Sequence, residues 1–309
     1  LVDPADAPLA VAAETLEVPA DRQFKDLAAA IDAVEADAVL TVTPPVVHVK
    51  HAELAFACGL HLLTEKPISG ELGEAQRMVR LAKEAGKILM VAQNYRYSPP
   101  MQTLARLIHE KALGTLGHGH IDFYIPADFR GTFRESMPYP LLVDMTIHHL
   151  DLIRAVTGRN IAKVTAHTFN PPGSTYQHHA GLKMLLELDG GVPFSYSGDW
   201  SARGRGTTWN GAWRLQCENG VIELGTDGKI TRSTSDHWHK DTRVEGVCND
   251  GSAEQAQAAL LTRFVAACHT GTPPATSGED NLWSFGAVIA GVKSSEEGRS
   301  VDVAEMLNG

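Results

Sequence analysis

Lys66 follows a short apolar run and stands between an acid and a proline, in the sequence Thr64-Glu65-Lys66-Pro67. An amine at the end of a buried strand can be placed for chemistry. For an arbitrary lysine, a solvated loop charge is the commoner interpretation. The elements around Lys66 decide between the two interpretations.

A carboxylate and an imidazole form a second candidate site in residues 141–153, which we expect to be helical. Asp144 and His148 are four residues apart, so they share one face of that helix. Asp151 follows on roughly the same side, whereas His149 points about 100° away from His148. An Asp one turn from a His can orient the imidazole for proton transfer near neutral pH.

Two other interpretations of the Asp144 and His148 pair stay open. The two side chains can simply satisfy each other as buried polar groups, which is the better interpretation of an isolated Asp-x-x-x-His. A metal site with Asp144, His148 and His179 as ligands is the other alternative. The sequence supplies no further ligand at a recognisable spacing, so we expect no metal.

The segment around Lys66 alternates strand, helix, strand, helix, strand between Ala38 and Ala92. A strand ends before Pro44, and a helix from His48 stops at Gly59, a residue suited to a helix C-terminus. Ser69 is expected to cap the next helix. The expected strands are 38–43, 61–63 and 88–92, and the expected helices are 48–58 and the segment from Ser69 to Gly86. Such alternation indicates a parallel sheet with right-handed crossovers.

In a parallel sheet all strands end at the same edge, and ligands bind outside these carboxyl ends. Three strand ends therefore converge, namely Thr43-Pro44-Pro45, Glu65-Lys66-Pro67 and Asn94-Tyr95-Arg96. This placement, rather than composition, favours a chemical role for Lys66.

The second part of the chain predicts an α+β domain with a large open antiparallel sheet. Tight turns such as Asp189-Gly190-Gly191 connect its strands, and tight turns imply antiparallel pairing. The expected strands are 118–125, 161–169, 182–188, 192–200, 213–217 and 221–224, and the expected helices are 101–111, 252–269 and 282–294. We place an α/β Rossmann-type domain at 1–98 and this α+β domain at 99–309.

The net charge and the cysteine content of the chain limit which partners and compartment are expected. The chain has 309 residues and a net charge of −10, which argues against nucleic acid and anionic membranes as partners. Its four cysteines are far apart in the sequence and are expected to be reduced thiols of a cytoplasmic protein. Because one face of the open sheet must meet water or another subunit, a homodimer or homotetramer is expected.

These segments together resemble the Gfo/Idh/MocA family of sugar and inositol oxidoreductases, from Asp3 to Val303. The resemblance rests on Thr43-Pro44 with His48, on Gly59-Leu60-His61 leading into Glu65-Lys66-Pro67, on Arg96 with Pro99, and on Asp144-x-x-x-His148-x-x-Asp151. Trp213 through Gly220-Val221-Ile222 resembles the late strand pair of the family. Glu-Lys-Pro alone is weak evidence, but the set in this order is specific.

The resemblance implies hydride transfer between NAD, with NADP as the alternative, and a secondary hydroxyl of a sugar, inositol or related cyclic polyol. Lys66 and His148 would handle the proton of that hydroxyl, and Asp144 would bind substrate and steady His148. The family often has a cis peptide before the proline of Glu-Lys-Pro, so a cis bond is expected between Lys66 and Pro67. Tyr124 and Arg130 belong to a segment expected either to contact the substrate or to be an ordinary surface loop.

The resemblance also assigns residues to the cofactor. They are Asp3, Thr43, Pro44, His48, Glu65, Lys66, Asn94 and Arg96. An acid at Asp3 would bind the ribose hydroxyls and favour NAD. The chain departs from the family because no G-x-G-x-x-G precedes Asp3, so we expect the native protein to carry a further βα unit of about 30 residues. A non-catalytic sugar-binding or regulatory protein is the alternative if that loop is truly absent.

Overall fold

The computed structural model describes residues 1–236, 238, 240–250 and 256–308. The chain forms two compact units. One consists of Leu1–Val91 and Phe264–Gly278, and the other of Ala92–Arg263 and Glu279–Gly309. The domain assignment 1–98 and 99–309 stays a prediction.

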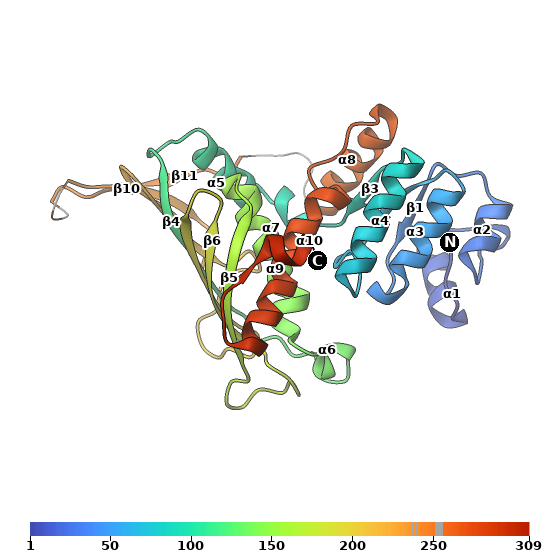
Figure 1. Cartoon of the computed structure of the whole chain (residues 1–309), viewed down its shortest axis with the longest axis horizontal. Coiled ribbons are helices and arrows are strands. Elements are labelled where there is room, and N and C mark those ends of the chain that lie inside the picture. The colour runs from blue at the N-terminus through green and yellow to red at the C-terminus, as the bar shows by residue number, and fades with distance from the viewer. Residues whose placement is uncertain (237, 239, 251–255, 309) are drawn as a thin grey trace. The chain divides into compact units, whose positions relative to one another are not determined.

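The first unit is built on a three-stranded parallel sheet in the order β1-β2-β3 (Figure 1). In chain order its helices and strands are α1 (Asp6–Thr15), α2 (Leu27–Ala33), β1 (Ala38–Thr41), α3 (His48–Ala57), β2 (His61–Thr64), α4 (Leu72–Ala85) and β3 (Leu89–Val91). Helix α3 packs on β1, β2 and α4, while α4 packs on β3. The predicted Rossmann-type alternation is therefore confirmed. Helices α1 and α2 were not among the predicted elements.

Burial of apolar strand residues holds this unit together. Leu62 and Leu63 of β2 and Met90 of β3 are almost completely buried, as expected for strands covered on both faces. The returning segment 264–278 extends the edge of β3, because Thr276 accepts a hydrogen bond of 2.8 Å from the backbone of Val91. Among the described strands β1 pairs only with β2, and its Leu40 is 55% exposed.

The capping prediction for α4 is wrong at its N-terminus and confirmed at its C-terminus. The N-cap residue is Glu71, with no side-chain cap. The hydroxyl of Ser69 donates instead to the carboxylate of Glu74 at 2.7 Å. Gly86 ends the helix in the left-handed conformation, with φ of 62°, which glycine adopts without the strain of a side chain.

The second unit contains a nine-stranded sheet in the order β11-β10-β9-β8-β4-β7-β6-β5-β12. Its strands are β4 (Leu116–Tyr124), β5 (Ile161–Phe169), β6 (Gly181–Leu188), β7 (Val192–Asp199), β8 (Ala212–Cys217), β9 (Gly220–Leu224), β10 (Ile230–Thr234), β11 (Arg243–Val247) and β12 (Val301–Asp302). Six of these strands were expected. The last three of the list, β10, β11 and β12, were not.

The helices of the second unit are α5 (Pro99–His109), α6 (Phe133–Ser136), α7 (Thr146–Thr157), α9 (Gly278–Glu297) and α10 (Val303–Asn308). Helix α8 (Ala256–Thr270) continues from this unit into the first. The first residues of the predicted helix 252–269 lie outside the described residues. Within the described ranges, no helix is both long and apolar enough to cross a membrane.

One ladder of the sheet is parallel. The β4–β7 pairing runs parallel from Gly119 with Phe194 to Tyr124 with Asp199, while the other ladders are antiparallel, so the predicted antiparallel sheet is in fact mixed. Gly119 is required at this ladder, because a Cβ there would lie 2.0 Å from the ring of Phe194.

The sheet has one covered and one open face. In β6 the side chains alternate, so Met184 is buried while Leu185 is exposed, as strand geometry requires. Helix α9 covers the buried side, where Gly291 lies against Met184. The helices of this unit lie along that side in Figure 1. The expected layering of helices on one face of a sheet is confirmed.

Candidate active site

The loop after β2 holds Lys66 beside the end of β1. The backbone N–H of Glu65 donates to Thr41 at 3.0 Å, and the backbone N–H of Lys66 donates to the carboxylate of Glu65 at 3.2 Å. The Lys66–Pro67 peptide bond is cis, as the resemblance led us to expect. Lys66 itself is half-buried.

His48 lies between two loops of the first unit. Its Nε2 is 2.9 Å from the carbonyl oxygen of Thr43, and its Nδ1 is 3.1 Å from that of Ile68. The ring is completely buried and ties the loop after β1 to the loop that carries Lys66. The bonds of His48 thus support the geometry of both loops, and a direct cofactor contact by this residue stays a prediction.

Asp3 is the predicted acid of the cofactor site. Its backbone N–H donates to Phe24 at 3.1 Å, next to a parallel bridge between Val2 and Phe24. One carboxylate oxygen accepts from the backbone N–H of Ala5 at 2.8 Å. The carboxylate is therefore held at the end of a short extended segment with a second oxygen that can accept from a ligand.

In the second unit, His148 projects from α7 toward the segment after β3. Its Nδ1 is 3.1 Å from Oε1 of Gln93, and its ring stacks on that of Tyr95 with centroids 4.3 Å apart. His148 and Gln93 are both buried. These two contacts fix the orientation of the imidazole ring.

Asp144 precedes α7 in a π-helical turn, Leu141–Met145. The predicted helix over 141–153 is thus present, but its first turn is wider than an α-helix. The carboxylate of Asp144 accepts from Nε of Arg134 at 2.6 Å, and only about a tenth of Asp144 is exposed. A short charge-assisted bond of this kind fixes the orientation of the carboxylate.

Arg96 lies in a buried ion-pair network rather than at a ligand-facing surface. Its guanidinium donates to both oxygens of Asp151, at 2.5 and 2.6 Å, and to Asp280 at 2.9 Å. Arg154 also binds Asp280, at 2.7 Å. Burial lowers the pKa of Arg96, but the two carboxylates outweigh that effect and raise it above its ordinary value. The cofactor role assigned to Arg96 stays a prediction.

His149 points away from His148, as predicted, and takes part in a buried hydrogen-bond chain. Thr146 donates to the hydroxyl of Tyr196 at 3.2 Å, and that hydroxyl lies 3.0 Å from Nδ1 of His149. Nε2 of His149 lies 3.0 Å from the carbonyl oxygen of Trp209. A carbonyl can only accept, so Nε2 carries the proton and Nδ1 accepts from Tyr196.

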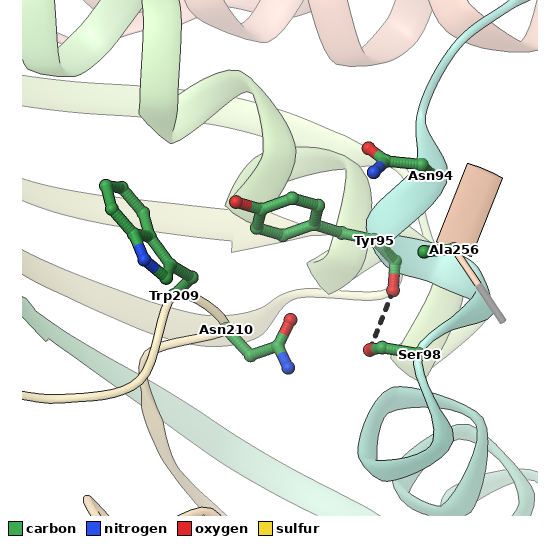
Figure 2. Close-up of a pocket in the computed structure, with 6 residues that line it drawn as sticks. All are labelled: Asn94, Tyr95, Ser98, Trp209, Asn210 and Ala256. Carbon is green, nitrogen blue, oxygen red and sulfur yellow. Dashed lines mark hydrogen bonds between the residues drawn. The ribbon is translucent and has the colours of Figure 1, made fainter.

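A cavity of about 350 Å³ lies beside Tyr95 (Figure 2). Its lining residues are Asn94, Tyr95, Ser98, Trp209, Asn210 and Ala256. The Tyr95 ring extends toward Trp209 with its hydroxyl foremost, and Ser98 donates to the carbonyl oxygen of Tyr95 at 2.9 Å. Because Tyr95 also stacks on His148, the cavity is one aromatic ring away from that imidazole.

Tyr124 and Arg130 lie apart from His148. The hydroxyl of Tyr124 is 2.7 Å from that of Ser197, on the sheet face opposite to Phe123, which packs on His149. Arg130 is exposed and pairs with Asp128 at 2.6 Å, beside a second hollow of about 380 Å³. Substrate contact by either residue stays a prediction.

Two of the residues around His148 and Asp144 were not predicted as site residues: Gln93 and Tyr95. Gln93 follows β3 directly, so its place at the carboxyl end of a strand was the available signal. No spacing singles out Arg134 over Arg130 in the same loop. Among the described residues, no group of three or more His, Cys, Asp or Glu side chains is placed to hold a metal ion.

A parallel βαβ unit with Lys66 at a strand end, and a helix that presents Asp144 and His148, define a dinucleotide-dependent oxidoreductase. Two family models match the chain in agreement with this class. The "Oxidoreductase family, NAD-binding Rossmann fold" model matches residues 1–93, and the "GFO/IDH/MocA C-terminal domain" model matches residues 101–223. The chain therefore belongs to the GFO/IDH/MocA family of NAD-binding oxidoreductases.

Individual relatives agree with this assignment. The chain is 27% identical to the D-apiose dehydrogenase of Paraburkholderia graminis, over 93% of this chain and 78% of the relative. It is 26% identical to the myo-inositol 2-dehydrogenase of Thermotoga maritima, over 93% of this chain and 86% of the relative. These names do not favour the non-catalytic alternative.

Solved structures share the fold. An oxidoreductase from Agrobacterium radiobacter, crystallised with NAD+, L-tartaric acid and magnesium, superposes with a TM-score of 0.89 at 22% identity. The superposition covers 99% of this chain and 91% of the other. Both predicted sheets are therefore those of a known fold.

His149 makes the stability of the protein depend on pH. Burial lowers its pKa to about 4, although the bond to the Trp209 carbonyl acts in the opposite direction. In the unfolded chain a His titrates near 6.5, so the unfolded state binds more protons between about pH 6.5 and 4. Stability contributed by the neutral ring is therefore complete above about pH 6.5 and is lost as the pH falls toward 4, by about 3 kcal/mol.

Urea unfolding at several pH values between 7.5 and 4.5 measures this loss. His149→Gln should unfold with a shallower pH dependence than the parent, whereas His167→Gln, which changes an exposed histidine of β5, should keep the parent slope. Equal slopes for the parent and His149→Gln would contradict the assignment of a neutral buried imidazole.

Proposed function

We propose that this protein transfers a hydride between NAD and a secondary hydroxyl, or the corresponding ketone, of a sugar, inositol or related cyclic polyol. The observation that carries the proposal is the fixed imidazole of His148, held by Gln93 and Tyr95 near the start of α7, directly after the π-helical turn that carries Asp144. The names of the dehydrogenase relatives support the substrate class.

His148 and Lys66 handle the proton of the reacting hydroxyl in this proposal. The imidazole of His148, oriented by Gln93, takes or returns the proton, and the Lys66 amine hydrogen-bonds the same oxygen and stabilises its charge. Asp144, oriented by Arg134, accepts a hydrogen bond from a substrate hydroxyl. A protein that only binds sugar would need neither proton carrier.

The residues of the first unit fit NAD. Asp3 has one carboxylate oxygen engaged by Ala5, and the other is suited to accept from ribose hydroxyls. Thr43, Pro44 and Glu65 line the loops at the carboxyl ends of β1 and β2, where dinucleotides bind in such folds. When bound, NAD supplies or accepts the hydride. Running the same assay with NADP tests the alternative cofactor.

The test is an assay of the full-length natural protein with NAD and a panel of inositols and aldoses, followed at the absorbance band of reduced nicotinamide. We expect sugar-dependent reduction of NAD and protection of the protein from thermal unfolding by NAD alone. No reduction with any member of the panel, in either direction and with either NAD or NADP, would refute the proposed function.

We further propose a cytoplasmic homodimer or homotetramer that associates through the open face of the sheet. Leu185 on this face is 67% exposed, and a broad sheet with one open face offers a surface for a symmetric subunit contact. Cys58 and Cys248 are exposed free thiols, in keeping with a reducing compartment. The net charge of −10 supports small-molecule rather than nucleic-acid or membrane partners.

A further inference from the structure

Among the described residues, no side chain with a formal charge lines the cavity beside Tyr95. Its lining residues carry amide, phenol, hydroxyl, indole and methyl groups, without a carboxylate, ammonium, guanidinium or imidazole among them. A buried carboxylate or phosphate is strongly disfavoured unless a cation or several donors compensate it. The lining therefore suits a ligand part that is neutral.

Three polar groups of the cavity are available to a ligand. Within the part of the chain that the structure describes, the amides of Asn94 and Asn210 and the hydroxyl of Tyr95 have no hydrogen-bond partner. Burial, assisted by the charge of Asp144, raises the pKa of Tyr95, so its hydroxyl stays neutral. Amides and phenols both donate and accept, which matches the hydroxyl groups of a polyol.

Trp209 supplies an aromatic wall of the cavity that faces Tyr95 (Figure 2). Two hydrogen bonds fix the backbone around Trp209. His149 donates to the carbonyl oxygen of Trp209 at 3.0 Å, and the Trp213 indole donates to the carbonyl oxygen of Asn210 at 2.7 Å. The Trp209 side chain is nevertheless 45% exposed. The electron-rich face of an indole attracts C–H groups with partial positive charge, such as those on one side of a sugar ring.

We propose that this cavity selects a neutral single-ring sugar or cyclic polyol over its carboxylated, phosphorylated or nucleotide-linked counterparts, with Trp209 stacked on the ring and the amides of Asn94 and Asn210 on its hydroxyls. This inference rests on the proposed function, and it names the substrate class within it. A volume of about 350 Å³ lies at the small end of ligand pockets and suits one ring.

The first experiment compares charge variants of the same ring on the full-length protein. D-glucose, D-glucuronate, D-glucose 6-phosphate and UDP-glucose form one series, and myo-inositol with its 1-phosphate forms another. The neutral member should have a kcat/KM and an affinity roughly a hundredfold higher than its charged counterparts, because none of the described lining residues compensates the charge. Affinity is measured by quenching of tryptophan fluorescence.

The second experiment uses variants of the wall. Trp209→Ala should raise KM for the preferred neutral sugar about tenfold with little change in kcat, and Trp209→Phe should largely restore it. Asn210→Arg adds a cation and should raise kcat/KM for the uronate relative to its neutral counterpart. The matched control is Trp238→Phe, at a side chain that is 90% exposed and not part of the cavity, and it should behave as the parent. Circular dichroism of each variant verifies folding.

The outcomes separate this inference from the proposed function. A charged or nucleotide-linked sugar that is turned over as well as the neutral ring overturns the inference and leaves the dehydrogenase function intact. An unchanged KM in folded Trp209→Ala overturns it as well. Sugar binding that depends on Trp209 without any hydride transfer refutes the proposed function and supports the neutral-ring site.

Discussion

Replacing Lys66 by methionine should lower kcat by a factor on the order of 10²–10⁴, the range that a positioned proton carrier contributes. Methionine keeps an unbranched apolar stem of similar length but has no proton to donate and no charge to stabilise the reacting oxygen. The affinity for NAD should change little, since the loop is held by backbone bonds of Glu65 and by His48. Steady-state rates and NAD titrations measure the two effects separately.

The control is Lys50→Met, which removes an exposed lysine of α3 and should leave kcat unchanged. Full activity of Lys66→Met would show that Lys66 is a solvated loop charge. Loss of NAD affinity in parallel with kcat would instead indicate that its main contact is with the cofactor.

Replacing Arg96 by methionine should reduce the free energy of unfolding by about 3–5 kcal/mol, because one partner of a buried ion pair is left without compensation. The side chain of Asp151 is only 2% exposed. Without Arg96 it would keep the hydrogen bond that Ser284 donates at 2.8 Å and a long ion pair with Arg154 at 3.9 Å. Urea denaturation followed by circular dichroism measures the loss. Affinity for NAD in the folded variant tests the cofactor role of Arg96 at the same time.

Two further variants serve as comparisons for Arg96→Met. Arg232→Met removes an exposed pair with Glu245 and should cost less than about 1 kcal/mol. The double variant Arg96→Met with Asp151→Leu should recover much of the lost stability, since an apolar pair can replace a buried ion pair. An Arg96→Met protein as stable as the parent would contradict the structural role of the network.

The sequence predicted those parts of the fold that are encoded locally. Strands such as β6 alternate buried and exposed side chains, and the glycine pair Gly190 and Gly191, both at positive φ, marks the turn into β7. Strands β10 and β11 were missed because their residues are largely polar and incompletely buried. Their position follows from pairing with β9, which is not readable from their own composition.

In the candidate site, too, the locally encoded residues were predicted and their pairing with distant segments was not. Asp144 and His148 were predicted because four residues along a helix bring two side chains onto one face. The partners that fix them, Gln93 and Arg134, come from other segments, and tertiary packing alone brings these together with the helix. Arg96 and Asp151 were identified as a pattern of the family, but their bonds to each other required the structure.

The expected cap of α4 by Ser69 shows that a residue preference does not fix a helix boundary. Serine is a favoured N-cap residue, yet its hydroxyl binds Glu74 and the helix begins after Glu71. The Ser69 oxygen accepts from the backbone N–H of Glu71, the N-cap residue itself, at 3.4 Å, and so not from a residue of the first helical turn.

The one parallel ladder of this sheet, β4 with β7, determines where the loops after these two strands begin. In an antiparallel pair, the chain leaves neighbouring strands at opposite ends, but here Tyr124 and Asp199 lie side by side at the two carboxyl ends. The outgoing segments remain paired just beyond, where Ala127 donates to Trp200 at 3.0 Å. The loop that carries Arg134 and the loop that carries Trp209 therefore start from a common origin. A change of length in either loop would leave the start of the other in place, because the shared ladder anchors both at one rim of the sheet.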